Sequence, residues 1–185
     1  CGSTGIQIVN ALSSRAAKLV HFQRSPQWIM PVVQFEYTAE QRAAFAADPS
    51  LIEAIRNDPQ YWEAVYRFTE GVTDFTSPQM HEIEELCRQN LEQSVRDPEL
   101  REKLRPDYHA ACKRLIVSWE YYECVQRPGV SVEVGAIERI VPEGVLMKDG
   151  TLHELDVLVL ATGFRADSFI RPAVVTGRGG RSLDE

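Results

Sequence analysis

Apolar residues near the start of the chain follow a helical spacing and then form a short continuous run. Ile6, Val9 and Leu12 recur at intervals of three and predict a helix. The segment 19–23 is mainly apolar and is expected to form a short strand after that helix. Residues 26–37 show neither period and contain prolines, so we expect an irregular loop there. A helix followed by a strand in this order is half of a βαβ unit.

The middle of the chain, residues 38–105, carries the signals of several helices. Thr38 heads a Thr-Ala-Glu-Gln capping box, and Ser50 is expected to cap a second helix that continues to Phe68. Further helices are expected to start at Ser77-Pro78 and at Asp97-Pro98. The aromatic residues of this part are expected to pack in a core or a lid. The helix after Ser77 is expected to present one apolar face made of Met80, Ile83, Leu86 and Leu91.

The last third of the chain changes to a strand period. Residues 130–134 alternate between valine and polar residues, and 137–141 with 145–147 are expected to form a hairpin. The run Leu155–Leu160 is apolar at all but one position and is followed by Ala-Thr-Gly-Phe. Such a run predicts a strand that is buried on both faces of a parallel sheet.

Composition places the chain among ordinary globular proteins. Its 185 residues are 44% hydrophobic and carry a net charge of −7, which gives no support for nucleic-acid binding. The charge is uneven, because residues 36–105 hold 15 acids and 8 bases whereas the remainder is neutral. We therefore expect an acidic, solvated helical subdomain. No apolar run reaches membrane-spanning length and no signal peptide is visible, so a cytoplasmic location is the default expectation.

The cysteines and histidines indicate no metal or redox centre. None of the four cysteines forms a C-x-x-C pair, and the four histidines are scattered along the sequence. No metal site is therefore expected, and no Ser-His-Asp spacing stands out. A reductase of the class with two dinucleotide-binding domains would need a redox-active cysteine pair or another flavin-facing acceptor, which the sequence does not offer.

A glycine-rich turn opens the chain. The first five residues read Cys-Gly-Ser-Thr-Gly and fit a G-x-G-x-x-G motif from its second position onward. Gly2 would let the backbone approach a pyrophosphate, and Gly5 would let the helix pack close to a strand. The first glycine and the strand before it are not in this sequence, so we expect the chain to be a piece of a longer protein. The alternative is a glycine-rich start to an ordinary helix.

Arg24 and Ser25 follow the predicted strand at the point where NAD-binding units place an acidic residue. An arginine there suits the 2′-phosphate of NADP, and a serine hydroxyl adds a hydrogen bond to it. The alternative is a surface arginine at a strand end. Together these signals predict an α/β fold, a Rossmann-like dinucleotide-binding domain with a helical insertion. Residues 1–37 and 106–185 would form that domain, incomplete at its N-terminus, and residues 38–105 the acidic helical insertion.

With these motifs the chain resembles the NADP-binding domain of a flavin-dependent Baeyer–Villiger monooxygenase, in the flavin-containing monooxygenase superfamily. The resemblance rests on four segments in the same order: Gly2–Ile8, Phe22–Trp28, Cys112-Lys113-Arg114 with Tyr121-Tyr122 after it, and Leu160–Phe164. It implies an enzyme in which NADPH reduces bound FAD, and molecular oxygen is then inserted into a ketone to give an ester or lactone. The resemblance further implies that NADP stays bound during oxygenation.

The resemblance also implies a role for individual residues. Arg24, Ser25 and Lys113 would hold the 2′-phosphate, and Arg114 would be the catalytic residue that stabilises negative charge beside the flavin. The other residues expected to bind cofactor are Gly2, Ser3, Thr4, Gly5 and Gln7 in the phosphate turn, and Ala161, Thr162 and Gly163 at the crossover towards an FAD domain.

Some parts of the family pattern are not in this sequence. The FAD-binding glycine motif and the family fingerprint with His and Trp are missing, so FAD would be bound mostly by regions outside it. Two alternatives stay open, namely a fragment of an N- or S-oxygenating flavin monooxygenase and a non-catalytic NADP-binding module. For the enzyme the expected partner is the FAD domain of the parent chain, and this segment alone is expected to be inactive. A parent without an FAD glycine motif upstream would instead support the binding module.

Overall fold

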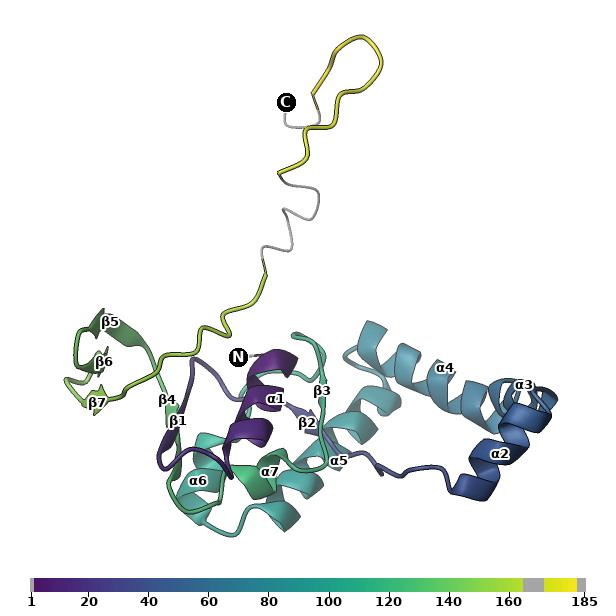
Figure 1. Ribbon diagram of the computed structural model, residues 1–185, viewed down its shortest axis with the longest axis horizontal. Coiled ribbons are helices and arrows are strands. Elements are labelled where there is room, and N and C mark those ends of the chain that lie inside the picture. The colour runs from purple at the N-terminus through teal and green to yellow at the C-terminus, as the bar shows by residue number, and fades with distance from the viewer. Residues whose placement is uncertain (1, 165–171, 183–185) are drawn as a thin grey trace.

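The computed structural model describes residues 2–164 and 172–182, and it combines helices with small sheets (Figure 1). The mixed α/β class predicted from the sequence is therefore confirmed. In chain order the elements are α1 Ser3–Leu12, β1 Leu19–Gln23, β2 Ile29–Met30, α2 Ala39–Ala47, α3 Ser50–Arg56, α4 Pro59–Thr73, α5 Pro78–Ser94, α6 Pro98–Lys103, β3 Ile116–Val117, α7 Tyr121–Cys124, β4 Val130–Val134, β5 Ile137–Val141, β6 Gly144–Met147 and β7 Leu152–Glu154.

The strands β1 and β4 form a parallel pair beside α1. Leu19 is opposite Val130, and the register continues to Gln23 opposite Val134. The backbone closes tightly at the start of this pair, where Leu19 N donates to the Gly129 carbonyl over 2.8 Å. Gly129 has φ of 81°, and a Cβ there would lie 2.5 Å from the Ala17 carbonyl oxygen. Only glycine fits this position without distortion.

A second parallel pair joins a segment that precedes the helical part in sequence to a segment that follows it. In this pair β2 and β3 place Ile29 opposite Ile116. The expectation of an irregular loop over residues 26–37 is therefore wrong for Ile29–Met30. Local sequence did not reveal the strand, because its partner follows 87 residues later and a two-residue strand shows no period.

Two clusters of buried side chains form the core, and α5 belongs to both. Leu91 of α5 packs in the larger cluster with residues of α1, α7 and the parallel strands. Met80, Ile83 and Cys87 of the same helix form the smaller cluster with Trp28 and Ala110. Thus α5 presents its apolar face as expected, except that Leu86 lies off that face and is exposed.

The helices α2, α3 and α4 are formed largely by local signals. Thr38 caps α2 with a complete capping box. The single helix expected from Ser50 to Phe68 is instead two, because Asp58 caps a new helix and Pro59 occupies its first turn. Ser50 is the first residue of α3 rather than its cap, and its N–H is held by the Asp48 carboxylate.

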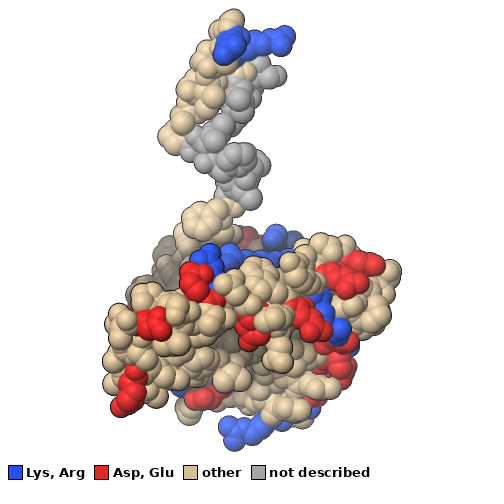
Figure 2. Space-filling view, turned by 90° about the vertical axis from the view of Figure 1, so that its right-hand side faces the viewer, with Lys and Arg blue, Asp and Glu red and all other residues tan. Residues whose placement is uncertain are grey.

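These three helices bury almost nothing. No residue of α2 or α3 is buried, and Gly71 is the only buried residue of α4. Trp62 and Tyr66 are 41% and 68% exposed, so these aromatic residues do not pack in a core, and the alternative of a lid stays a prediction. Figure 2 looks onto the side of the molecule that carries these helices and shows acidic and basic groups scattered among uncharged residues. The acidic charge of residues 36–105 is thus spread over a solvated surface.

The predicted hairpin is confirmed and extended by one strand. In the structure β5, β6 and β7 form a three-stranded antiparallel sheet, with Ile140 opposite Val145 and Val145 opposite His153. A turn at Asp149-Gly150 connects β6 to β7, since Thr151 N bonds to the Asp149 carboxylate and Gly150 has positive φ.

The predicted strand Leu155–Leu160 is wrong in this structure. The segment has no strand conformation and runs away from the body of the molecule as an extended arm (Figure 1). Val157 and Leu160 are 75% and 70% exposed. A strand buried on both faces needs neighbouring strands and covering helices. Within the described ranges, the sheet formed by β1 and β4 has only these two strands. Residues 155–160 therefore do not find neighbouring strands on both sides.

Candidate functional site

The first turn of α1 is open to solvent at its glycine. Gly2 is the N-cap residue of α1 and makes no side-chain cap, and a Cβ placed on it would meet no atom within 4 Å. Gly5 is buried against the body, as the motif requires. Side chains cap four other helices, through Thr38, Asp58, Ser77 and Asp97. No side chain of the described residues caps α1, so its first N–H groups are open to an external acceptor, and the helix dipole favours an anion there.

Lys113 and Ser25 lie together although 88 residues separate them. The Lys113 ammonium donates a hydrogen bond to the Ser25 hydroxyl. Lys113 Nζ also lies 4.1 Å from the ring centroid of Tyr108, a cation–π geometry. Both Lys113 and its neighbour Arg114 are exposed. The charge of Lys113 therefore faces solvent at the end of β1.

Tyr108 links the two loops that carry this pair. Its hydroxyl donates to the Pro26 carbonyl over 2.8 Å, and its own carbonyl accepts from Trp28 Nε1 over 2.7 Å. Burial is the main reason that the pKa of Tyr108 is raised to about 12, so the hydroxyl stays a neutral donor at physiological pH. The segment after β1 and the segment before Lys113 are thus bonded to each other twice.

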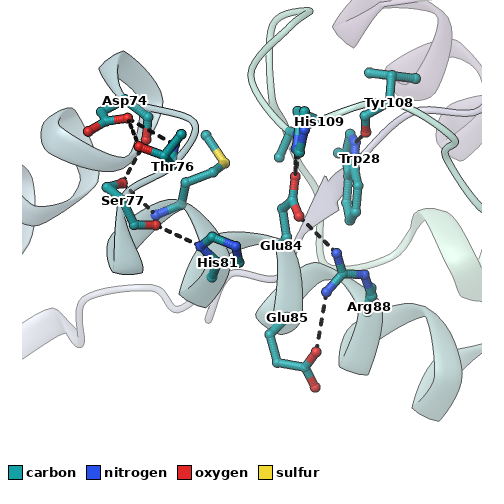
Figure 3. Close-up of polar contacts among 12 residues, drawn as sticks. Trp28, Asp74, Thr76, Ser77, His81, Glu84, Glu85, Arg88, Tyr108 and His109 are labelled. Atoms are coloured by element: carbon teal, nitrogen blue, oxygen red, sulfur yellow. Dashed lines mark hydrogen bonds and ion pairs between the residues drawn. The ribbon is translucent and has the colours of Figure 1, made fainter.

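Glu84 of α5 holds the next two residues of the same loop (Figure 3). One carboxylate oxygen accepts from His109 Nδ1 over 2.9 Å and from Ala110 N over 3.1 Å, and the other accepts from Arg88 over 2.8 Å. Burial acts to raise the pKa of Glu84, but these hydrogen bonds and the neighbouring cations outweigh it and the pKa is lowered. Glu84 is therefore a charged acceptor at the base of the loop.

Arg24 and Arg114, the two arginines predicted to act in the site, are both exposed. Neither makes a hydrogen bond or ion pair within residues 2–164 and 172–182, and both are available to a ligand. Arg24 directly follows β1, next to Ser25. Because α1 leads back into β1 through a short connection, the start of α1 and the end of β1 lie at the same end of this unit (Figure 1).

The structure does not bring every predicted residue to this place. Ser3, Thr4 and Gln7 lie on the first two turns of α1, with Thr4 and Gln7 exposed. Ala161, Thr162 and Gly163 lie on the extended arm that follows β7, and Thr162 and Gly163 are exposed (Figure 1). Their cofactor-binding roles, like those of the other predicted residues, stay predictions.

Sequence reasoning missed Tyr108, Glu84 and His109. Tyr108 and His109 sit in an aperiodic loop and gave no signal. Glu84 did carry one, because it lies four residues after Met80 and three before Cys87, on the apolar face of α5. A carboxylate at such a position is rarely buried unless it is paired, so it points to a specific partner.

Other kinds of site find less support. A hollow of about 260 Å³ lies between α4 and α5, lined by Phe68, Ile83 and Leu86 among others, and it shares no residue with the Lys113 loop. Within the described ranges, no group of three His, Cys, Asp or Glu side chains is arranged for a metal ion. No helix of that same part is long and apolar enough to cross a membrane.

A glycine turn that opens a helix, followed by a parallel strand that ends at a serine bonded to a lysine, is typical of a dinucleotide-binding unit. Comparison with known proteins identifies the class: over its full length the chain is related to FAD-binding and Baeyer–Villiger monooxygenases, as its motifs predict. No protein-family model matches the chain.

Three curated relatives illustrate this relationship. An uncharacterized monooxygenase of Mycobacterium bovis is 37% identical over 100% of this chain and 36% of its own length. A Baeyer–Villiger monooxygenase of Streptomyces coelicolor is 30% identical over 100% of this chain and 35% of its own length. An FAD-binding monooxygenase of Aspergillus niger is 34% identical over 100% and 30%. The chain thus spans about a third of the length of the curated relatives it matches.

Solved structures agree with the curated relatives. The open crystal structure of cyclohexanone monooxygenase matches 100% of this chain and 43% of its own, with a TM-score of 0.79 and 29% identity. Cyclohexanone monooxygenase from Rhodococcus sp. Phi1 bound to NADP⁺ matches 99% of this chain and 41% of its own, with a TM-score of 0.78 and 30% identity.

Proposed function

We propose that this chain forms the NADPH-binding part of an FAD-dependent monooxygenase that inserts oxygen into ketones to give esters or lactones. The observation that carries the proposal is the convergence of Lys113 and Ser25 beside the free Arg24 at the end of β1. The relationship to Baeyer–Villiger monooxygenases over the whole chain, and the NADP⁺ bound in a similar solved structure, support it.

The fold we propose is Rossmann-like, with residues 1–37 and 106–185 forming the coenzyme domain and residues 38–105 a helical insertion. The parallel pairing of β1 with β4 beside α1 supports this assignment. So does the position of α2 to α6, which all fall between residues 38 and 105. The neutral charge of the outer segments and the acidic charge of the insertion agree with the same division.

The residues present fit an NADP molecule. Gly2 leaves room for a pyrophosphate at the start of α1, where no side-chain cap competes for the N–H groups. Arg24 and Lys113 supply two positive charges for the 2′-phosphate, and Ser25 supplies a hydroxyl. Each charge-assisted contact of this kind contributes roughly 1.5–3 kcal/mol to binding. NADH lacks that phosphate, so these groups favour NADPH.

The chemistry of oxygen insertion belongs to the flavin, which accepts the hydride and reacts with oxygen when bound. In the proposal, this chain binds and orients the coenzyme and contributes a positive charge through Arg114. A guanidinium stays protonated at every working pH and stabilises negative charge strongly where water is excluded. Arg114 has no partner in the described structure that would neutralise it.

The test is made on the full-length protein that contains this segment. Bound flavin is measured by absorbance, oxidation of NADPH and NADH is followed at saturating oxygen, and the products from cyclic and open-chain ketones are analysed. Ester or lactone formation coupled to NADPH oxidation is the expected result. Oxygenation of amines or sulfides without any ester would favour the alternative monooxygenase class. Binding of NADPH without its oxidation would show that the protein is a non-catalytic binding module.

A further inference from the structure

Lys113 is held by a neighbour that touches both sides of the candidate phosphate site. The Tyr108 ring lies under the Lys113 ammonium at 4.1 Å, and the Tyr108 hydroxyl bonds to the Pro26 carbonyl at 2.8 Å. Pro26 directly follows Ser25, the hydrogen-bond partner of Lys113. A single side chain therefore sets the distance between the lysine and the serine that are proposed to bind the 2′-phosphate.

Glu84 holds the adjoining part of the loop against α5 (Figure 3). It bonds to His109 and Ala110, which directly follow Tyr108, and its buried carboxylate is bonded from three directions. His109 also stacks on Phe75, with ring centroids 5.8 Å apart. Ala111 comes next and has φ of 66°, in the left-handed region that alanine rarely adopts. The loop is thus fixed by hydrogen bonds just before this strained residue, and Lys113 follows just after it.

We propose that Tyr108 and Glu84 are positioning residues that hold Lys113 against Ser25 and thereby set the preference for NADPH over NADH. This inference rests on the proposed function of the site. The physical reason is conformational entropy, because a lysine side chain has many rotamers and loses them on binding an anion. A lysine already held by a ring and a hydroxyl has lost much of that freedom before NADPH arrives. NADH, without the 2′-phosphate, gains nothing from this arrangement.

The experiment uses the full-length protein and the dissociation constants of NADPH and NADH, measured by calorimetry. Tyr108→Leu removes the ring and the hydroxyl, and we expect NADPH to bind about tenfold more weakly with little change for NADH. Tyr108→Phe keeps the ring and loses only the bond to Pro26, so a smaller loss is expected. Glu84→Gln keeps an acceptor for Ala110 but loses the charge, and it should also lower the NADPH preference.

The matched control is Glu85→Gln, the neighbouring carboxylate on α5. Glu85 is exposed and bonds to Arg88 and Gln89 but to no residue of the 108–113 loop. This variant should keep the wild-type ratio of the two dissociation constants. Melting temperatures of all variants show which of them are destabilised. A variant that weakens NADPH and NADH equally, or melts early with an unchanged ratio, would contradict a positioning role.

Lys113→Ala separates this inference from the proposed function. If Lys113→Ala leaves the ratio unchanged, the proposed phosphate site itself is wrong, and the inference is wrong with it. If Lys113→Ala lowers the ratio but Tyr108→Leu and Glu84→Gln do not, only the inference is wrong. In the double variant Lys113→Ala/Tyr108→Leu, the second substitution should cost no further preference, because Tyr108 acts through Lys113. Additive losses of NADPH preference in the double variant would show that Tyr108 does not act through Lys113.

Discussion

The hydrogen bond from Lys113 to Ser25 joins the two segments of the chain that lie on either side of the helical part. Ser25 follows β1, and Lys113 precedes β3, so the bond is made only when the chain between them folds back. The helix α5 provides that return, since its Asn90 side chain donates to the Ile29 carbonyl and its Glu84 holds Ala110. The helical segment, through α5, therefore helps directly to form the candidate coenzyme site.

The first prediction concerns coenzyme choice. Replacing both Arg24 and Lys113 by alanine removes the two charges proposed to face the 2′-phosphate. In the full-length protein, NADPH should bind more weakly by roughly 3–6 kcal/mol, from about 1.5–3 kcal/mol for each charge-assisted contact. NADH binding should change little. Titration of both coenzymes into the double variant checks this. Equal losses for the two would remove Arg24 and Lys113 from phosphate recognition.

The second prediction is a pH dependence of stability caused by His21. Burial lowers the pKa of His21 from 6.5 to about 4, and its Nδ1 is bonded to the Tyr121 hydroxyl. The unfolded chain takes up this proton near pH 6.5, whereas the folded state stays neutral until about pH 4. The stabilisation is thus complete above pH 6.5 and is lost as the pH falls towards 4, by about 2 kcal/mol at pH 5.

Chemical denaturation between pH 7.5 and 5 measures this loss. His21→Gln keeps a polar group for Tyr121 but has no proton to take up, so its stability should fall less over the same range. The lowered pKa of Glu84 moves its own titration to more acidic pH, away from that of His21. An identical slope in the wild type and in His21→Gln would show that His21 is not the group responsible.

The third prediction compares two helix caps. Ser77 caps α5, accepting from Met80 N and donating to the Asp74 carbonyl at 2.7 Å (Figure 3). Because α5 packs in both core clusters, Ser77→Ala should lower the free energy of unfolding by about 1–2 kcal/mol. Thr38 forms a complete capping box on α2, but α2 buries no residue. Thr38→Ala should therefore leave global stability unchanged.

Amide hydrogen exchange and urea denaturation together distinguish the two effects. The amides of α2 should exchange much faster than those of α5 in the wild type, and Thr38→Ala should accelerate exchange in α2 alone. If Thr38→Ala shifts the urea midpoint as much as Ser77→Ala does, then α2 unfolds together with the core although it buries no residue.

Much of this structure is encoded locally and could be predicted. The capping box of Thr38, the start of α5 at Ser77-Pro78 and the alternation of Val130–Val134 each depend on neighbours in sequence. The run Leu155–Leu160 shows the limit. Its composition indicates burial, but burial needs strands on both sides, and these are not among the described residues. Composition tells what an element prefers, and only its partners decide whether it forms.

The candidate site divides in the same way. Arg24 and Ser25 were predicted from their place after a strand and Lys113 from the resemblance to the monooxygenase family, and their binding of a phosphate stays a prediction. The residues that hold them together could not be predicted, since the bond from Tyr108 to Pro26 spans 82 positions and follows no period. Glu84 was detectable in principle, as a carboxylate on an apolar helix face. Its partners His109 and Ala110 were not, because they depend on the path of an irregular loop.

The last prediction assigns separate tasks to Lys113 and its neighbour Arg114. Both are exposed, but Lys113 is bonded to Ser25 whereas Arg114 has no partner in the described part of the chain. We therefore predict that Lys113 binds the coenzyme phosphate and that Arg114 stabilises negative charge beside the flavin. In the full-length protein, Arg114→Ala should leave NADPH affinity nearly unchanged, slow the reduction of the flavin and abolish ester formation.

Arg114→Lys tests whether charge alone is enough. An ammonium is a compact, strongly hydrated charge and lacks the planar fork of a guanidinium, so this variant should recover little activity. Stopped-flow absorbance of the flavin measures its reduction, and product analysis measures the ester. The Lys113→Ala variant provides the opposite pattern, with weakened NADPH binding but ester formation restored when NADPH is saturating. A wild-type ester yield from Arg114→Ala would exclude Arg114 from the chemistry and leave it as a basic residue on the surface beside Lys113.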